Sequence, residues 1–356
     1  MVHCGRMRTP LRHRVCLTRP AEMIAAVPHL LGFHPENSLI LITLRGEGAA
    51  DVGPTMRIDL PPPRNRHAVT EQFVAVVRRQ NASAAVLIVI GGGGADPPDD
   101  VPHSDLIAAL DSALGAAGVP VMHAAWAEST AAGAAWCCYH ESGCGGALPD
   151  PKETVLAAAN AVEGSVTFAN REELAALVRL DDDRPAMNRR SNELEQAAWQ
   201  VEQAGGRMSR AAARQALLRV HDAVAAANVG DVVLGDDEVV RLAAALSDSR
   251  VRDACLATAG GEHAAAAERL WLALTRSTPP PERAQPATLL AFSAYLRGDG
   301  ALASIALEQA EAAMPGHRLA GLLRHSLDFG LPPGRLTVIV ADAAADAEAL
   351  LGGPTG

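Results

Sequence analysis

Aromatic side chains are scarce in this chain of 356 residues, which contains five Phe, four Trp and two Tyr. With so few rings, the core must be filled mostly by Ala, Val and Leu, which suit closely packed helices and a sheet rich in Val and Ile. The chain is longer than one hydrophobic core usually serves, so about two domains are expected.

Long apolar runs are absent from the sequence. No run approaches the roughly 18 residues that a membrane span requires, so we expect no membrane partner. Pro10, Pro20 and Pro28 interrupt the apolar stretch that a basic targeting segment would need. We therefore predict that residues 1–16 form a disordered basic extension.

Cysteine is also sparse. Six cysteines in a chain of this length, with Cys137 next to Cys138, do not resemble the disulfide framework of a small secreted protein. A cytoplasmic location is therefore expected.

Positive charge is deficient outside the N-terminus. The net charge is -10, yet five arginines and no acid lie in the first twenty residues, so the remainder carries about -15. This balance argues against nucleic acid as a partner. The five residues are Arg6, Arg8, Arg12, Arg14 and Arg19.

Residues 17–150 combine both hydrophobic periods. Apolar runs predict strands at 39–42, 55–60, 84–90, 119–126 and 134–139, and amphipathic stretches predict helices at 21–31, 66–80 and 104–117. Strands that alternate with helices predict an α/β domain with a mixed, mostly parallel sheet and flanking helices.

Residues 151–333 are predicted to form an all-helical domain. Helices are expected at 153–162, 171–178, 192–204, 209–227, 237–246, 263–275, 287–297, 300–313 and 317–329. Residues 334–356 are expected to form a C-terminal strand, at 336–340, or a tail.

One predicted helical pair has the spacing of a tetratricopeptide unit. Small and apolar residues recur where two helices would cross, and a proline follows the second helix. No second copy is evident, so the pattern predicts a tetratricopeptide-like hairpin at the end of the helical domain and not a solenoid. The residues are Leu290, Ala291, Ala294, Gly298, Ala303, Leu307, Ala310 and Pro315.

Several strings carry a family resemblance. The longest, at residues 27–38, is Val-Pro-His-Leu-Leu-Gly-Phe-His-Pro-Glu-Asn-Ser; others occupy 18–22, 57–61, 287–292, 296–301 and 330–333. Through them the chain, from about residue 17 to 333, resembles an actinobacterial family known only as domain of unknown function 4192. The resemblance implies relatedness and an actinobacterial source, but no activity. This sequence departs from the pattern expected of the family at residues 135–139, where it has Ala-Trp-Cys-Cys-Tyr in place of a Trp-Ser-Tyr-like strand.

The loop at residues 34–38 is the densest group of potentially reactive side chains. His34 could act as a general base, with Glu36 orienting it and Ser38 serving as a nucleophile or a ligand hydroxyl. In the structural alternative, Asn37 and Ser38 make side-chain bonds that start the following strand. No Gly-x-Ser-x-Gly motif surrounds Ser38, so a hydrolase elbow is unsupported.

Arg57 and Asp59 share one face of the strand predicted at 55–60. An ion pair or a solvated face explains such a pair, and a ligand anchor is the alternative if this face meets His34.

A run of glycines, Gly91 to Gly94, follows the apolar strand at 84–90, where open α/β sheets bind ligands. No Lys-Ser or Lys-Thr follows, and Asp96 stands where the last glycine of Gly-x-Gly-x-x-Gly would be. A plain loop is therefore favoured over a nucleotide site, and no cofactor is expected.

Cys138, His140 and Cys144 are weak metal candidates. They could supply part of a zinc site, but a second ligand pair is missing, so no metal is expected. Cys138 and Cys144 could instead form a redox-sensitive pair across a turn, or remain free thiols.

Two functions follow from these patterns. In the first, the protein is a binding module: the α/β domain holds a small molecule or a protein partner near residues 34–38, and the helical domain docks another protein. In the second, it is a hydrolase or transferase that uses His34, Glu36 and Ser38. Binding is preferred because no catalytic arrangement is complete in the sequence.

Overall fold

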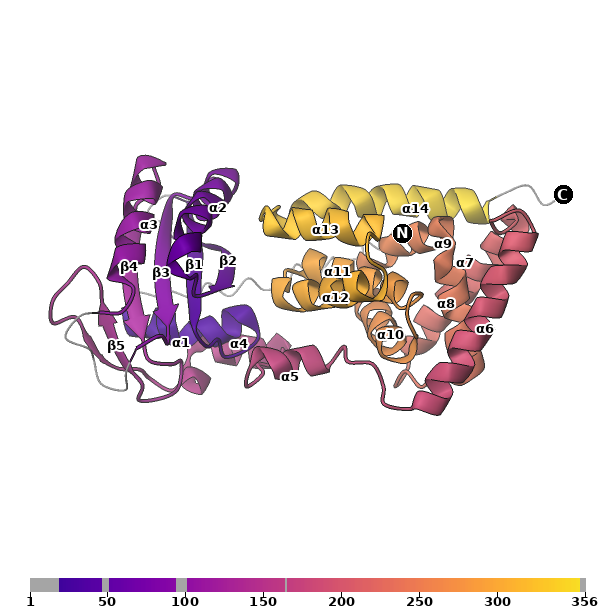
Figure 1. Cartoon of the computed structure of the whole chain (residues 1–356), viewed down its shortest axis with the longest axis horizontal. Coiled ribbons are helices and arrows are strands. Elements are labelled where there is room, and N and C mark those ends of the chain that lie inside the picture. The colour runs from indigo at the N-terminus through magenta and orange to yellow at the C-terminus, as the bar shows by residue number, and fades with distance from the viewer. Residues whose placement is uncertain (1–18, 47–50, 94–100, 164, 353–356) are drawn as a thin grey trace, which may run out of the picture. The chain divides into compact units, whose positions relative to one another are not determined.

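The computed structural model describes residues 19–46, 51–93, 101–163 and 165–352 (Figure 1). The chain divides into two compact units after Asn170, whereas the sequence analysis placed a boundary after residue 150. The predicted extension at residues 1–16 lies outside the described residues.

The first unit contains four α-helices and six strands among its described residues. The helices are α1 (Pro20–Leu31), α2 (Arg66–Arg79), α3 (Ser104–Ala116) and α4 (Val155–Glu163). The strands are β1 (Ser38–Arg45), β2 (Asp51–Asp59), β3 (Ala84–Ile90), β4 (Val121–Ala127), β5 (Ala135–Cys138) and β6 (Gly145–Ala147).

The six strands form one mixed sheet in the order β2-β1-β3-β4-β5-β6. Only β3 and β4 are parallel neighbours, so the prediction of a mostly parallel sheet was wrong. The crossover through α2 does join two strands of the same direction, β2 and β3. However, β1 lies between them and runs antiparallel to both, so that crossover creates no parallel pair.

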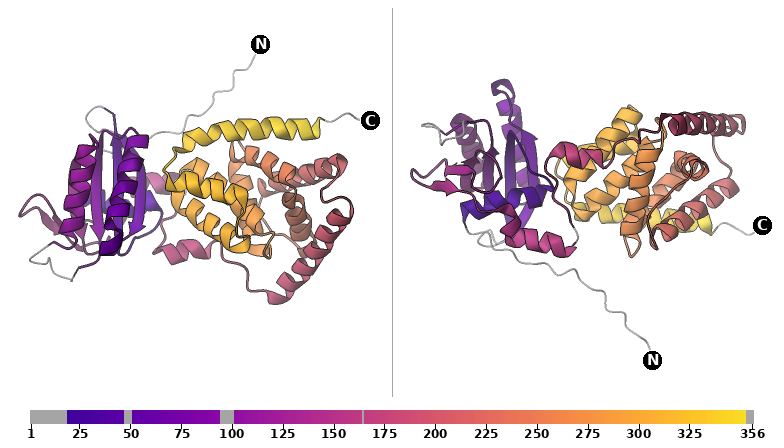
Figure 2. Two further views of the ribbon diagram at one scale, coloured as in Figure 1. Left: turned by 45° about the horizontal axis from the view of Figure 1, so that its top comes forward. Right: turned by 90° about the horizontal axis from the view of Figure 1, so that it is seen from below.

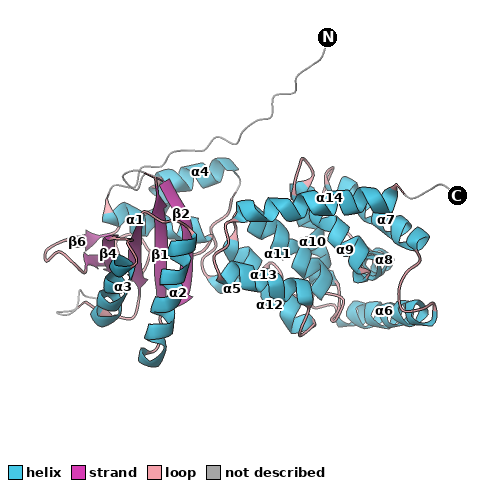
Figure 3. Ribbon diagram, turned by 90° about the horizontal axis from the view of Figure 1, so that it is seen from above, coloured by secondary structure: helices cyan, strands magenta, loops and turns pink. Residues whose placement is uncertain are grey.

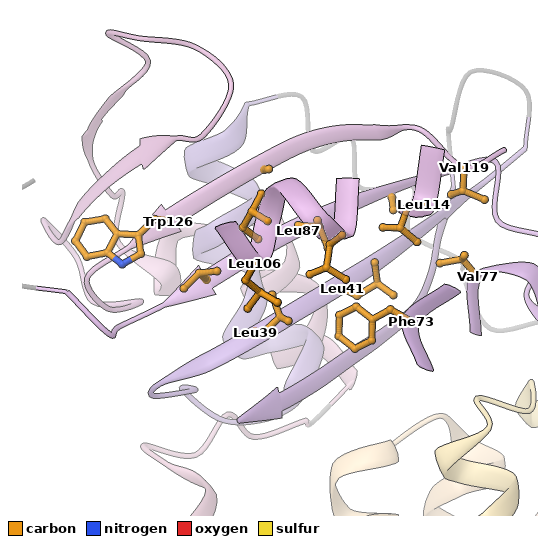
Figure 4. Close-up of a cluster of buried hydrophobic side chains, with 14 residues drawn as sticks. Leu39, Leu41, Phe73, Val77, Leu87, Leu106, Leu114, Val119 and Trp126 are labelled. Carbon is orange, nitrogen blue, oxygen red and sulfur yellow. The ribbon is translucent and has the colours of Figure 1, made fainter. Parts of the chain in front are cut away.

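Helices cover both faces of the sheet. Figure 3 shows α2 and α3 on one face and α1 and α4 on the other. Alternate residues of β1, such as Leu39 and Leu41, join Phe73 of α2 and Leu106 of α3 in a buried cluster (Figure 4). Every residue of β3 is buried, as expected for a strand covered on both faces.

The sheet has two outer strands. At one edge, β2 contains Pro54, which lies at an irregularity in the β1–β2 register. At the other edge, β6 is only three residues long.

The second unit is helical throughout its described residues. Its α-helices are α5 (Arg171–Ala176), α6 (Arg184–Gln203), α7 (Arg210–Ala227), α8 (Asp236–Ser247), α9 (Ser249–Cys255), α10 (Ala264–Ser277), α11 (Ala284–Arg297), α12 (Gly300–Ala313), α13 (Arg318–Asp328) and α14 (Thr337–Leu351). Short 3-10 turns, η4 (Leu256–Ala259) and η5 (Pro333–Leu336), precede α10 and α14.

The predicted hairpin corresponds to α11 and α12. Every residue of α11 from Ala284 to Tyr295 is buried, which its nearly continuous apolar and small composition allows. Gly298 ends α11 in the left-handed conformation, with φ 95°, and Asp299 then caps α12 by accepting a hydrogen bond from the backbone N–H of Leu302 at 2.9 Å.

The prediction of a strand at 336–340 was wrong, because this segment leads into α14, drawn in yellow in Figures 1 and 2. Helix α14 packs on α7 and α9 through Ala343, Ala347 and Leu350, so the unit does not end at the α11–α12 hairpin. The spacing of these buried residues is helical, but the β-branched run before them favoured a strand.

Candidate functional site

The turn between α1 and β1 is fixed at both ends. Gly32 ends α1 with φ 78°, and the buried Phe33 forms a β-bridge with Phe168. The backbone N–H of His34 donates to the carbonyl of Phe168 at 3.1 Å, and the N–H of Phe168 donates to the carbonyl of Gly32 at 2.8 Å. A segment distant in sequence therefore holds the start of the loop in place.

Ser38 lies at the centre of a polar network in this loop. Its buried Oγ donates to the carbonyl of Glu36 at 2.6 Å and accepts from Nε of Arg57 at 2.8 Å. Arg57 also forms an ion pair of 2.7 Å with Asp59 and lies 6.0 Å from the ring centroid of Phe33. The hydroxyl proton of Ser38 is thus already donated to a backbone carbonyl.

His34 is turned to a different partner. Its Nδ1 is hydrogen-bonded to Oγ1 of the buried Thr130 at 2.7 Å. Burial, together with the nearby His29 and Lys152, lowers the pKa of His34 below its usual value, so the imidazole is neutral at pH 7. Within the described part of the chain, no hydrogen bond joins His34 to Glu36 or Ser38.

The predicted site residues therefore separate into two groups. The main chain of Glu36 and the side chains of Ser38, Arg57 and Asp59 come together, while His34 joins Thr130. The side chain of Glu36 is exposed, and Asn37 is held with φ 42°.

The glycine turn after β3 packs tightly on its surroundings. A Cβ atom at Gly91 would lie 2.9 Å from Oδ1 of Asn37, and one at Gly92 would lie 2.6 Å from Nε2 of His103. Both glycines have positive φ, which also disfavours any side chain there. The turn is therefore fitted between Asn37 and His103. The last glycine of the run, Gly94, lies outside the described residues, as do the acids that follow it.

His103 is a site residue that the sequence analysis missed. It immediately precedes α3 with φ 61°, and burial and the nearby Arg66 lower its pKa. Its Nε2 atom is buried and has no hydrogen-bond partner among the described residues, which is rare for a buried polar atom. The signal in the sequence was a histidine directly before an amphipathic helix.

The loop at residues 34–38, the glycine turn and His103 all lie near the same end of the strands, at the edge of the sheet that the strand ends form. Ser38 pairs with Asp59 on one side and with Ile90 on the other, and Ile90 pairs with Ala127. The start of β1 therefore lies beside the carboxyl ends of β2, β3 and β4. We call the groups gathered here, namely His34, Asn37, the Gly91–Gly92 turn and His103, the sheet-edge site.

The cysteine candidates lie on the β5–β6 hairpin. The Sγ atoms of Cys138 and Cys144 are 2.7 Å apart, but His140 is turned to Asp111, with 3.4 Å between Nε2 and a carboxylate oxygen. The part of the chain that the structure describes contains no cluster of three or more His, Cys, Asp or Glu side chains that could hold a metal.

A hollow lies in the helical unit. It has a volume of about 450 Å³, and its lining is polar and apolar. The lining residues come from α7, α9, α14 and the segment before α7: Arg207, Arg210, Ser249, Arg250, Asp253, Asp346, Ala349 and Leu350. Arg210 donates to the carbonyl of Ala349 at 2.6 Å, and Arg250 donates to Asp248 and to the carbonyl of Met208. The arginines thus already brace helix ends. Sequence analysis missed the hollow because its residues are distant in the chain.

Comparisons with other proteins identify a family. No curated protein and no solved structure matched the chain. A search of the described residues found no helix that is both long and apolar enough to cross a membrane. A family model matches residues 20–334, which is most of the chain. The chain therefore belongs to the family described as Domain of unknown function (DUF4192).

Proposed function

We propose that the first unit binds a small polar ligand at the sheet-edge site. The observation that carries this proposal is the buried Nε2 of His103 beside the glycine turn, which has no hydrogen-bond partner among the residues that the structure describes. A buried polar atom without a partner is costly, and a ligand group that hydrogen-bonds to it would remove that cost. The carboxyl ends of strands in open α/β sheets are also the usual position of a ligand.

The charge state of the two histidines supports recognition by hydrogen bonding. The pKa values of His34 and His103 are both lowered, so both rings are neutral at pH 7. A neutral imidazole has one N–H donor and one acceptor nitrogen, and it suits a polar ligand better than an ion-pairing one.

The alternative function, a hydrolase or transferase that uses His34, Glu36 and Ser38, has less support. Ser38 donates its proton to the carbonyl of Glu36 and accepts from Arg57, so no base among the described residues is positioned to activate its oxygen. In our proposal, Ser38, Arg57 and Asp59 shape the turn, and His34, Glu36 and Asn37 remain available to a ligand.

We also propose a role for the helical unit as a docking module for a protein partner. The supporting feature is the close pairing of α11 and α12, which has the small-residue spacing of a tetratricopeptide-like hairpin. A cytoplasmic location and an actinobacterial source complete this proposal.

A thermal-shift screen tests the ligand proposal. Wild-type protein, His103→Asn and His34→Gln would be heated with a panel of sugars, amino acids, nucleosides and small carboxylic acids. Asn is chosen for position 103 because it tolerates positive φ. The expected result is a compound that raises the melting temperature of the wild type and loses this effect in both variants.

The matched control is His67→Asn, because His67 is highly exposed on α2. It should respond to the compound as the wild type does. A stabilising compound that acts equally on the wild type and on both site variants would place binding elsewhere and reject the sheet-edge site.

A further inference from the structure

The β5–β6 hairpin places two thiols face to face. Cys137 pairs with Gly145 in the antiparallel register, so the next two residues outward, Cys138 and Cys144, lie opposite each other where the strands diverge. The backbone N–H of Cys138 donates to the carbonyl of Cys144 at 2.9 Å. Their Sγ atoms are 2.7 Å apart, so the thiols are already in contact.

The other described cysteines are not placed to compete for this pairing. Cys137 follows the strand alternation to the opposite face, where it packs against the buried cluster of Figure 4. Cys255 is almost completely buried in the helical unit. Among the described cysteines, only Cys138 and Cys144 have sulfur atoms in contact.

The two thiols differ in access to solvent. Cys144 is partly exposed and follows the exposed Glu141, Ser142 and Gly143, whereas Cys138 is buried. Burial, the neighbouring thiol and nearby negative charge raise the pKa of Cys138. An oxidant in solution would therefore meet Cys144 first, because attack requires a thiolate that solvent can reach.

We propose that Cys138 and Cys144 form a reversible disulfide by exchange with a small disulfide such as glutathione disulfide. The Cys144 thiolate attacks one sulfur of glutathione disulfide, and a glutathione thiolate leaves. Cys138 then loses its proton to solvent and attacks the Cys144 sulfur, which expels the second glutathione. Two protein thiols are oxidised to one disulfide, and one glutathione disulfide is reduced to two glutathione thiols.

The position of the pair gives the disulfide a structural effect. The disulfide would link the two ends of the hairpin loop. Tyr139 is the first residue of this loop, and its hydroxyl donates to the carbonyl of Pro102 at 2.6 Å. Pro102 immediately precedes His103. Oxidation would thus tighten the hairpin that contacts the chain at the start of α3.

The experiment is carried out on the whole 356-residue chain. Reduced and desalted protein is exposed to excess glutathione disulfide, residual thiols are alkylated, and the protein is analysed by intact mass and by peptide mapping. The expected product has lost two hydrogen atoms, contains a peptide that joins Cys138 to Cys144, and returns to the dithiol on treatment with dithiothreitol.

Two variants give the control. Cys144→Ser should eliminate the cross-linked peptide, whereas Cys137→Ser, which changes the adjacent residue of the same strand, should retain it. The proposal is overturned if wild-type Cys144 keeps a stable glutathione adduct, if both thiols remain fully alkylated, or if Cys137 is the residue joined to Cys144. Circular dichroism of each variant verifies that it is folded.

Discussion

At the scale of single residues, Ser38 is the centre of the polar network at the turn from α1 into β1, while His34 binds the distant Thr130. Ser38 is buried between the carbonyl of Glu36 and the guanidinium of Arg57, and Arg57 is held in turn by Asp59. Each donor in this network has an acceptor, so the network determines the path of the chain from α1 into β1.

Replacing Ser38 with Ala should therefore destabilise the protein by about 1–2 kcal/mol, because a guanidinium N–H and a carbonyl lose their partner. Urea unfolding followed by circular dichroism measures this change. Ser142→Ala is the control, since Ser142 is exposed on the hairpin and its loss should alter stability by less than about 0.5 kcal/mol. Equal stability of the two variants would contradict a role for Ser38 in the turn.

His317 shows how one neutral histidine supports a helix. Its Nδ1 accepts from the backbone N–H of Ala320 at 3.1 Å and caps α13, so its Nε2 carries the proton and donates to Gln285 at 3.0 Å. Arg252 and Asp253 also face the ring, and burial and Arg252 lower its pKa from 6.5. Protonation would remove the acceptor that the cap requires.

The stability of the protein should therefore fall in acid. Unfolded protein binds a proton at His317 more readily than folded protein, so this stabilising contribution is complete above about pH 6.5 and is lost as pH falls through the folded pKa. His317→Asn keeps a capping acceptor without this titration, and it should flatten the dependence of the unfolding free energy on pH between about pH 7 and 5. The same pH dependence in the variant and in the wild type would contradict this role; His67→Asn is the control.

The sequence predicted part of the candidate site and could not predict the rest. Ser38, Arg57 and Asp59 could be grouped because the strands predicted at 39–42 and 55–60 are neighbours in the sequence, and β1 does pair with β2 in the structure. The contact between His34 and Thr130 spans 96 residues, and the fit of Gly92 against His103 depends on the packing of a loop. Neither contact has a local pattern in the sequence, so neither could be predicted from it.

At the scale of elements, α14 is a helix whose first residues have a local preference for a strand, which packing overrides. Thr337 to Val340 is rich in β-branched residues that favour strands, yet the following alanines are buried at helical spacing. Packing on α7 and α9 determines the outcome, because tertiary contacts override weak propensities.

A pair of substitutions distinguishes the two conformations. Ala343 is buried and Ala345 is exposed in α14, although both would lie on the same face of a strand. Ala343→Asp should cost more than about 2 kcal/mol, because it buries a carboxylate, whereas Ala345→Asp should cost less than about 0.5 kcal/mol. Similar losses in urea unfolding experiments would argue against the helix.

The fold was otherwise predictable where the sequence of an element allowed one interpretation, either as a continuous apolar strand or as a helix. The predicted strand at 84–90 and helix at 300–313 match β3 and α12 in both position and type. Strand direction was not predictable in the same way, because the sequence does not reveal that β1 lies between β2 and β3. Short elements also escaped prediction: α9 has only seven residues, too few for a periodic pattern to emerge.

At the scale of the whole molecule, charge is the property most directly linked to partners. The net charge of -10 includes five arginines in the first twenty residues, so the rest of the chain should repel nucleic acid. Any binding would arise from those arginines and would weaken steeply with salt, because it depends on the release of counterions.

Fluorescence anisotropy with labelled duplex DNA and single-stranded RNA tests this expectation. Wild-type protein should bind weakly at low salt, and binding should disappear near physiological salt. A variant with Ser in place of the five N-terminal arginines should bind at neither salt concentration. Binding that persists in this variant at physiological salt would contradict the prediction.

The two edge strands of the sheet also affect the self-association of the protein. A strand with a free row of backbone amides can template the addition of another chain and start a fibre. Pro54 deprives β2 of one amide proton, and β6 is too short to offer an extended row. We therefore expect Pro54 and the shortness of β6 to limit polymerisation through the sheet, and we expect replacement of Pro54 to weaken this protection at β2, the longer of the two edge strands.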